Sequence, residues 1–142
     1  MKFFFNSSDN EDAIKAKNSL INKYGQYSPE QSDIIIPIGG DGFLLKNLHK
    51  FHNLNIPFFG INYGSIGFLM NPHAKNNLIT IIENSKETIL TPLDMKAYDE
   101  NNNSFYSIAY NEVSMMRQTH QAAKLNIHIN NIERMSELIC DG

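Results

Sequence analysis

The chain has 142 residues, of which 42% are hydrophobic, and its 12 basic and 15 acidic side chains give a formal charge of −3. This length allows one ordinary domain, or a small domain followed by part of another. The mild acidity and the lack of a dense Lys/Arg run argue against a nucleic-acid partner. No apolar stretch reaches the roughly 18 residues of a membrane span, so we expect no membrane partner. The single cysteine, Cys140, excludes an internal disulfide, and we expect a cytoplasmic protein.

The first half of the chain alternates between strand and helix patterns. The run Ile34-Ile35-Ile36 is typical of a strand buried on both faces. Gly25 is of the residue type that commonly follows the last turn of a helix, so we expect a helix to end there. The predicted strands are 2–5, 33–38 and 56–60, and the predicted helices are about 11–24, 43–52 and 74–84. This rhythm predicts an α/β fold, with an N-terminal parallel sheet and helices on both of its faces.

The second half shows no helical pattern after about residue 86. Turn-like asparagines at 101–103 and 130–131 separate short apolar or alternating stretches, which predict an incomplete β-rich second domain built as a meander. The predicted strands are 88–93, 95–98, 105–110, 112–116 and 125–129. We therefore divide the chain into an α/β domain, 1–87, and a partial β-rich domain, 88–142. About 55 residues are few for an independent β core.

The segment Gly39-Gly40-Asp41-Gly42 lies between a predicted buried strand and the helix after it. Open α/β sheets bind ligands at the carboxyl ends of their strands, and a helix N-terminus offers free N–H groups that suit phosphate. Glycines allow the backbone to approach a ligand closely. A carboxylate here can orient or deprotonate an attacking hydroxyl, or hold Mg²⁺. An equally weighted alternative is a tight turn in which Asp41 caps the following helix.

Three further segments carry polar groups but are weak signals when taken one at a time. The loop 60–69 follows a predicted strand, so it should lie beside the first turn at the same sheet edge. Asn111-Glu112 offers an amide and a carboxylate suited to ribose hydroxyls or an adenine edge. The third is Cys140-Asp141-Gly142. An ordinary loop or a solvated strand end explains each of them equally well or better.

Taken together, GGDG, GINYGSIGFL, NEVSMMR and CDG, in this order and at these intervals, resemble the NAD kinase family. The resemblance covers essentially the whole chain. It implies transfer of phosphate from ATP, or polyphosphate in some members, to the 2′-hydroxyl of the adenosine ribose of NAD, giving NADP. It also implies a two-domain subunit whose β-rich part binds NAD, small-molecule nucleotides as partners, a divalent cation such as Mg²⁺, and a homo-oligomer.

Carried over position by position, the resemblance assigns the catalytic role to Asp41 and no residue to a metal site. The positions that match nucleotide-binding residues of the family are Asp41, Gly42, Phe68, Asn111, Glu112 and Asp141. Phe43 stands where many members have threonine, and Ile139 stands where some have a nucleotide-contacting arginine.

The family pattern continues beyond CDG into a TPxGSTAY-like segment that this chain lacks. We therefore expect a truncated chain that depends on further residues for activity, for instance a separately encoded C-terminal half. Two alternatives stay open: a non-catalytic remnant, and a diacylglycerol-type lipid kinase, which shares GGDG. His49 and His52 have helical ligand spacing but no third ligand near them in sequence, so we assign them no metal role.

Overall fold

The computed structural model of the chain describes residues 1–65, 67–73 and 77–142. These residues form two compact units, Met1–Asn111 and Glu112–Gly142. The domain division at residues 87/88 remains a prediction. Within the described residues, no helix has both the length and the apolar character needed to cross a bilayer.

The first unit begins with a parallel three-stranded sheet. Its strands are β1 (Phe3–Ser7), β2 (Ile34–Gly39) and β3 (Ile61–Asn62), in the spatial order β1-β2-β3. Phe5 pairs with Ile36, and Ile38 pairs with Ile61. β2 lies in the middle of the sheet, and its last five residues are all buried. The predicted fold class, an α/β sheet followed by a β-rich segment, is confirmed.

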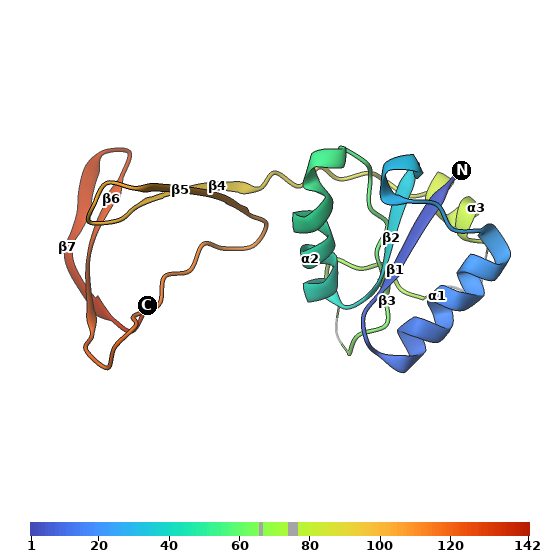
Figure 1. Cartoon of the computed structure of the whole chain (residues 1–142), viewed down its shortest axis with the longest axis horizontal. Helices are drawn as coiled ribbons and strands as arrows, with labels where there is room; N and C mark the ends of the chain where they lie inside the picture. The colour runs from blue at the N-terminus through green and yellow to red at the C-terminus, as the bar shows by residue number, and fades with distance from the viewer. Residues whose placement is uncertain (66, 74–76) are drawn as a thin grey trace. The chain divides into compact units, whose positions relative to one another are not determined.

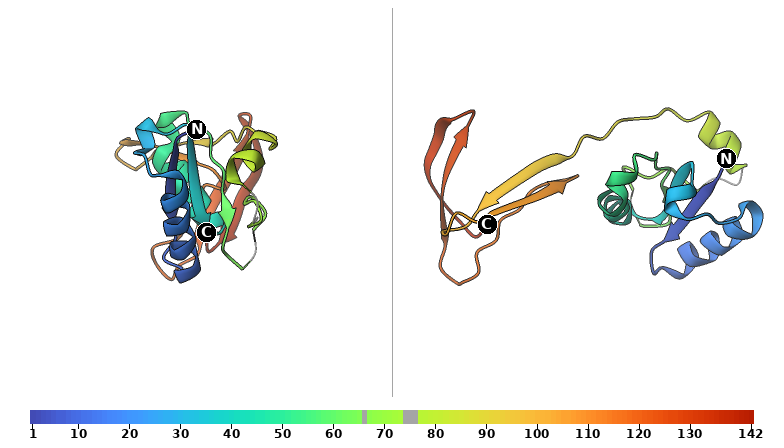
Figure 2. Two further views of the ribbon diagram at one scale, coloured as in Figure 1. Left: turned by 90° about the vertical axis from the view of Figure 1, so that its right-hand side faces the viewer. Right: turned by 45° about the horizontal axis from the view of Figure 1, so that its top comes forward.

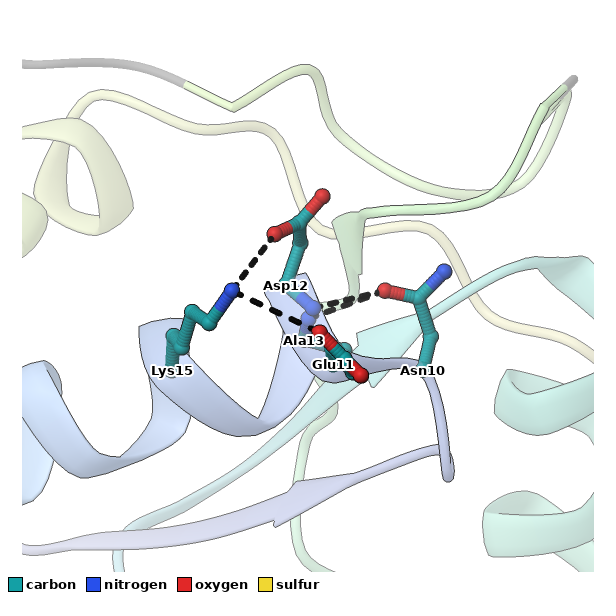
Figure 3. A network of polar contacts seen from close by, with 5 residues as sticks. All are labelled: Asn10, Glu11, Asp12, Ala13 and Lys15. Carbon is teal, nitrogen blue, oxygen red and sulfur yellow. Dashed lines mark hydrogen bonds and ion pairs between the residues drawn. The ribbon is translucent and has the colours of Figure 1, made fainter.

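Helix α1 (Glu11–Tyr24) begins and ends where the sequence predicts. The side chain of Asn10 accepts hydrogen bonds from the N–H groups of Asp12, at 2.8 Å, and Ala13, at 3.3 Å, which are free at a helix N-terminus. Lys15 lies within 4 Å of the Glu11 and Asp12 carboxylates (Figure 3). The helix ends at Gly25, whose φ of 80° favours glycine.

The helices cover both faces of the sheet (Figure 1). α1 and α3 (Leu78–Glu83) pack on the face that carries Phe3 and Phe5. α2 (Asp41–Phe51) lies on the other face, where Phe51 contacts Phe4 edge-on at 5.6 Å. Because successive strands are neighbours while α1 and α2 lie on opposite faces, the two strand–helix–strand connections have opposite hands. One of them therefore departs from the usual right-handed rule.

Strands β1 and β2 and helix α2 agree with the predicted ranges to within two residues, but two other elements of the α/β part differ more. The strand expected at 56–60 is reduced to an isolated bridge between Phe58 and Ile35, and regular pairing begins only at β3. Pro57 lacks an N–H and contributes only its carbonyl, which accepts from Ile35 at 3.0 Å. The helix expected at 74–84 begins at Leu78 after its N-cap Asn77, and residues 74–76 lie outside the described residues.

The remainder of the chain forms two antiparallel hairpins (Figure 2). The first unit contains β4 (Leu93–Tyr98) and β5 (Ser104–Ala109), and the second contains β6 (Ala123–Ile129) and β7 (Ile132–Cys140). The predicted meander is therefore two separate hairpins. Of the strand expected at 88–93, only Leu93 lies in a strand, as the first residue of β4, the strand expected at 112–116 does not form, and β7 was not predicted. The asparagine turns are confirmed, since Asn102, Asn130 and Asn131 have positive φ.

Candidate active site

The GGDG turn joins the carboxyl end of β2 to α2. Gly40 is the N-cap, with extended backbone angles and no side-chain cap. The helix begins at Asp41, which is half-buried. The Asp41 carboxylate does not bond to the N–H groups of its own helix but accepts hydrogen bonds from the backbone N–H groups of Phe68, at 2.8 Å, and Leu69, at 3.1 Å. The alternative in which Asp41 merely caps α2 is therefore wrong.

The second glycine loop packs directly against this turn, backbone to backbone. The Tyr63 N–H donates to the Gly39 carbonyl at 2.7 Å. A Cβ added at Gly64 would lie 3.0 Å from the Cα of Gly40, so this approach requires glycine. Around Gly42 a Cβ would meet nothing within 4 Å. The first turn therefore has open space beside the start of α2, next to N–H groups that the helix leaves unpaired.

Two asparagines organise the second loop, and sequence reasoning assigned them no role. Asn62 accepts a hydrogen bond from the Gly64 N–H at 2.9 Å, and a Cβ at Gly67 would clash with the Asn62 amide. Asn71 closes the base of the loop, because its backbone and side-chain N–H groups both donate to the Gly60 carbonyl. Asparagine flanking a glycine-rich segment is the signal that could have indicated this. Ile66 of the predicted loop lies outside the described residues.

Two more predicted residues lie in the first unit. The Phe68 side chain is 90% exposed, beside the Asp41 carboxylate that holds its backbone. Asn111 is exposed and follows Tyr110, whose ring packs against the α2 cluster that includes Leu44. The structure thus brings Asp41, Gly42 and Phe68 together, and it anchors the segment before Asn111 on the α2 face of the sheet.

Glu112 and Asp141 lie in the second unit. Glu112 is exposed and precedes an irregular segment. The Asp141 carboxylate pairs with the Arg117 guanidinium at 3.0 Å, and the Arg117 N–H donates to the Asp141 carbonyl at 3.3 Å. The arginine that ends NEVSMMR therefore pairs with the aspartate of CDG.

A cavity of about 240 Å³ lies between α1, α3 and β3, and none of the predicted site residues lines it. Tyr63 of the second loop forms part of its wall and hydrogen-bonds to His73, with 2.9 Å from the hydroxyl to Nδ1. Burial raises the pKa of the Tyr63 hydroxyl, and the charge of Asp12 raises it further. Within the described parts of the chain, no three His, Cys, Asp or Glu side chains gather as a metal site.

A parallel sheet with adjoining glycine turns at its carboxyl edge and a helix N-terminus beside them is an arrangement with which α/β proteins commonly bind phosphate. Residues 4–88 match the family model described as the ATP-NAD kinase N-terminal domain. The chain belongs to the NAD kinase family.

Its curated relatives agree with this assignment, and a solved structure shares its fold. It is 52% identical to the NAD kinase of Rickettsia felis over 119 residues, which are 84% of this chain and 47% of that protein. It is also 52% identical to the NAD kinase of Rickettsia typhi over 113 residues, which are 80% of this chain and 44% of that protein. The chain thus spans about half the length of these relatives. Its fold matches a crystal structure of an NAD kinase from Archaeoglobus fulgidus in complex with ATP, with a TM-score of 0.70, 20% identity, and coverage of 99% of this chain and 58% of that one.

Proposed function

We propose that the chain supplies the GGDG half of an NAD kinase, which transfers phosphate from ATP or polyphosphate to the 2′-hydroxyl of the adenosine ribose of NAD. The observation that carries this proposal is the junction of the two glycine turns at the sheet edge, with Asp41 at the start of α2. Membership of the family supports the choice of NAD as the acceptor over a lipid.

In the proposed reaction, Asp41 orients the ribose 2′-hydroxyl and accepts its proton. The 2′-oxygen then attacks the terminal phosphorus of the donor, and with ATP the bond to the bridging oxygen breaks to release ADP. The open space at Gly42 and the free N–H groups at the start of α2 suit the donor phosphates. Phe68, which is largely exposed, would offer its ring to a nucleobase or ribose.

The remaining predicted residues complete the NAD side of the proposal. Asn111 and Glu112 would bind the ribose hydroxyls or adenine edge of NAD, and Asp141 would contact a nucleotide from beside Arg117. A divalent cation fits this donor set through one carboxylate and the substrate phosphates, as is usual for Mg²⁺. Such an ion would neutralise charge on the donor phosphates. We also propose a cytoplasmic location and a homo-oligomeric assembly, which exposed apolar residues such as Ile132 and Ile139 support.

The test is an assay of NADP formation from NAD, ATP and Mg²⁺. It uses the chain alone and the chain mixed with a polypeptide covering the other half of a Rickettsia relative. We expect NADP in the mixture and a loss of about 10²–10⁴-fold in turnover for Asp41→Ala, the range for removing a general base. Asp12→Asn, a matched acidic change in the first turn of α1, should leave turnover unchanged.

Three other results of this experiment would contradict the proposal, each in favour of a different alternative. Equal turnover of the wild type and Asp41→Ala would remove Asp41 from the chemistry. Phosphorylation of diacylglycerol in preference to NAD would favour a lipid kinase. A folded mixture that binds neither nucleotide would favour a non-catalytic remnant.

A further inference from the structure

The Asp41 carboxylate bridges two consecutive backbone amides of the second loop. Each oxygen accepts one N–H, with Oδ2 bonded to Phe68 and Oδ1 to Leu69, from a position 27 and 28 residues earlier in the chain. Hydrogen bonds to an ionised acceptor are stronger than those between neutral groups. We propose that Asp41 is also a positioning residue, whose carboxylate holds the Phe68-Leu69 backbone and so sets the direction of the Phe68 ring.

The rest of the loop shows why this contact matters. The base is fixed independently of Asp41, by the Asn71 bonds to Gly60 and by Met70, which is 7% exposed and packs against α2. The Phe68 side chain is not fixed in this way, because its ring is 90% exposed and gains little from packing. The direction of the ring therefore depends on the backbone that the Asp41 carboxylate holds.

The contact between Asp41 and the loop does not depend on the proposed function, but its effect on activity rests on that function. There, changing Asp41 removes a proton acceptor and also releases the aromatic ring proposed to contact nucleotide. Loss of activity in an Asp41 variant then combines a chemical effect and a positional one. Asparagine and alanine separate the two, because the asparagine carbonyl still accepts one N–H while its NH₂ group cannot accept the other.

Amide hydrogen exchange, followed by NMR on the full chain without nucleotide, tests the contact directly. In Asp41→Ala we expect exchange of the Phe68 and Leu69 amides to rise by about tenfold or more, in keeping with the loss of hydrogen bonds to a charged group. Asp41→Asn should give an intermediate increase. The Ile35 and Phe59 amides, which bond between β2 and the 57–59 segment, should be unchanged in both variants. Glu11→Gln, at the exposed start of α1, should change none of these amides.

Unchanged Phe68 and Leu69 exchange in Asp41→Ala would overturn the proposal. An equal rise in exchange at Ile35 and Phe59 would also overturn it, because Asp41 would then stabilise the whole fold and not the loop in particular. The outcome is independent of phosphotransfer, since no nucleotide is present. A kinase assay that fails while the local exchange effect appears would reject the proposed function alone, and the reverse would reject only the positioning role.

Discussion

In the α/β region, residues 3–84, apolar side chains are gathered into a core, whereas in the two hairpins they are exposed or only half-buried. Among the described residues, every buried hydrophobic side chain lies between Phe3 and Leu78. In the hairpins, Phe105, Ile132 and Ile139 are each more than half exposed. Burial of apolar area is the main stabilising contribution to a fold, so the α/β region carries its own stability. The hairpins must rely on strand pairing and on their turns.

The two hairpins are held together by local contacts in place of a buried core. The Lys96 ammonium lies over the rings of Tyr98 and Tyr106, at 5.0 and 5.1 Å from their centres, across the β4–β5 pair. Asn130 and Asn131 form the two-residue turn between β6 and β7, both with positive φ, as this hairpin turn requires. An isolated two-stranded hairpin is only marginally stable in water, so we expect the hairpins to be less stable than the α/β region with its core.

The largest test of this contrast substitutes the same residue type in each region. Ile36 in β2 is fully buried and Ile139 in β7 is 58% exposed. We expect Ile36→Ala to lower the free energy of unfolding by about 2–5 kcal/mol, through lost burial and the cavity left behind. Ile139→Ala should change it by about 0.5 kcal/mol or less. Urea unfolding followed by circular dichroism measures both, and equal effects would show that β7 belongs to a buried core.

The same contrast explains which elements could be predicted from the sequence. Strands β1 and β2 and helix α1 have clear sequence patterns, such as the Ile34-Ile35-Ile36 run and the glycine at the end of the helix. The core that these elements form together stabilises the predicted structure. The hairpin strands lack a buried face, so alternation did not mark β7, and it suggested a strand at 112–116 where none forms. Pattern reasoning works where burial selects the pattern.

The candidate site was predictable to a similar extent. The glycine turn and the neighbouring loop could be placed at one sheet edge because parallel strands share their carboxyl ends. The partners of the Asp41 side chain could not, since Phe68 and Leu69 contribute only backbone N–H groups, which every residue type except proline carries. The pairing of Asp141 with Arg117 likewise depends on how the segment before β6 folds back.

A smaller test uses two glycines of the α/β region that differ in the space around them. A Cβ at Gly60 would collide with Sδ of Met70 and lie 3.2 Å from its Cε, whereas Gly42 has nothing within 4 Å. Gly60→Ala should therefore cost about 1–3 kcal/mol through overpacking. Gly42→Ala should change stability by about 0.5 kcal/mol or less, as for an open surface position. Thermal or urea unfolding of the two variants compares them directly. If Gly60→Ala left the stability unchanged, the Met70 side chain would be able to move aside, and the base of the loop would be less tightly packed than its burial indicates.

The smallest expected effect concerns the turn between β4 and β5. Here one exposed carboxylate adds to two backbone hydrogen bonds, from the Asp99 N–H to the Asn103 carbonyl and from the Asn102 N–H to the Asp99 carbonyl. Asp99 accepts hydrogen bonds from the side-chain and backbone N–H groups of Asn103, at 2.7 and 2.8 Å, and from the Asn101 N–H at 2.9 Å. These bonds, those from Asn103 foremost, hold the pKa of the Asp99 carboxyl below its ordinary value. Because the pKa is lowered in the folded turn, the stabilisation is present above the ordinary value of about 4 and is lost as the pH falls through the lower folded value.

The amide signals of Asn101 and Asn103, followed by NMR between pH 6 and about 2, should therefore shift with a midpoint below that of an unperturbed aspartate. Asp99→Asn should abolish the titration while keeping one acceptor in the turn. The α/β core should not respond, since the titrating group lies outside it and is exposed. A midpoint at or above the ordinary value would mean that the carboxylate does not hold this turn. Strand pairing and the two backbone hydrogen bonds of the turn would then be what holds the β4–β5 hairpin.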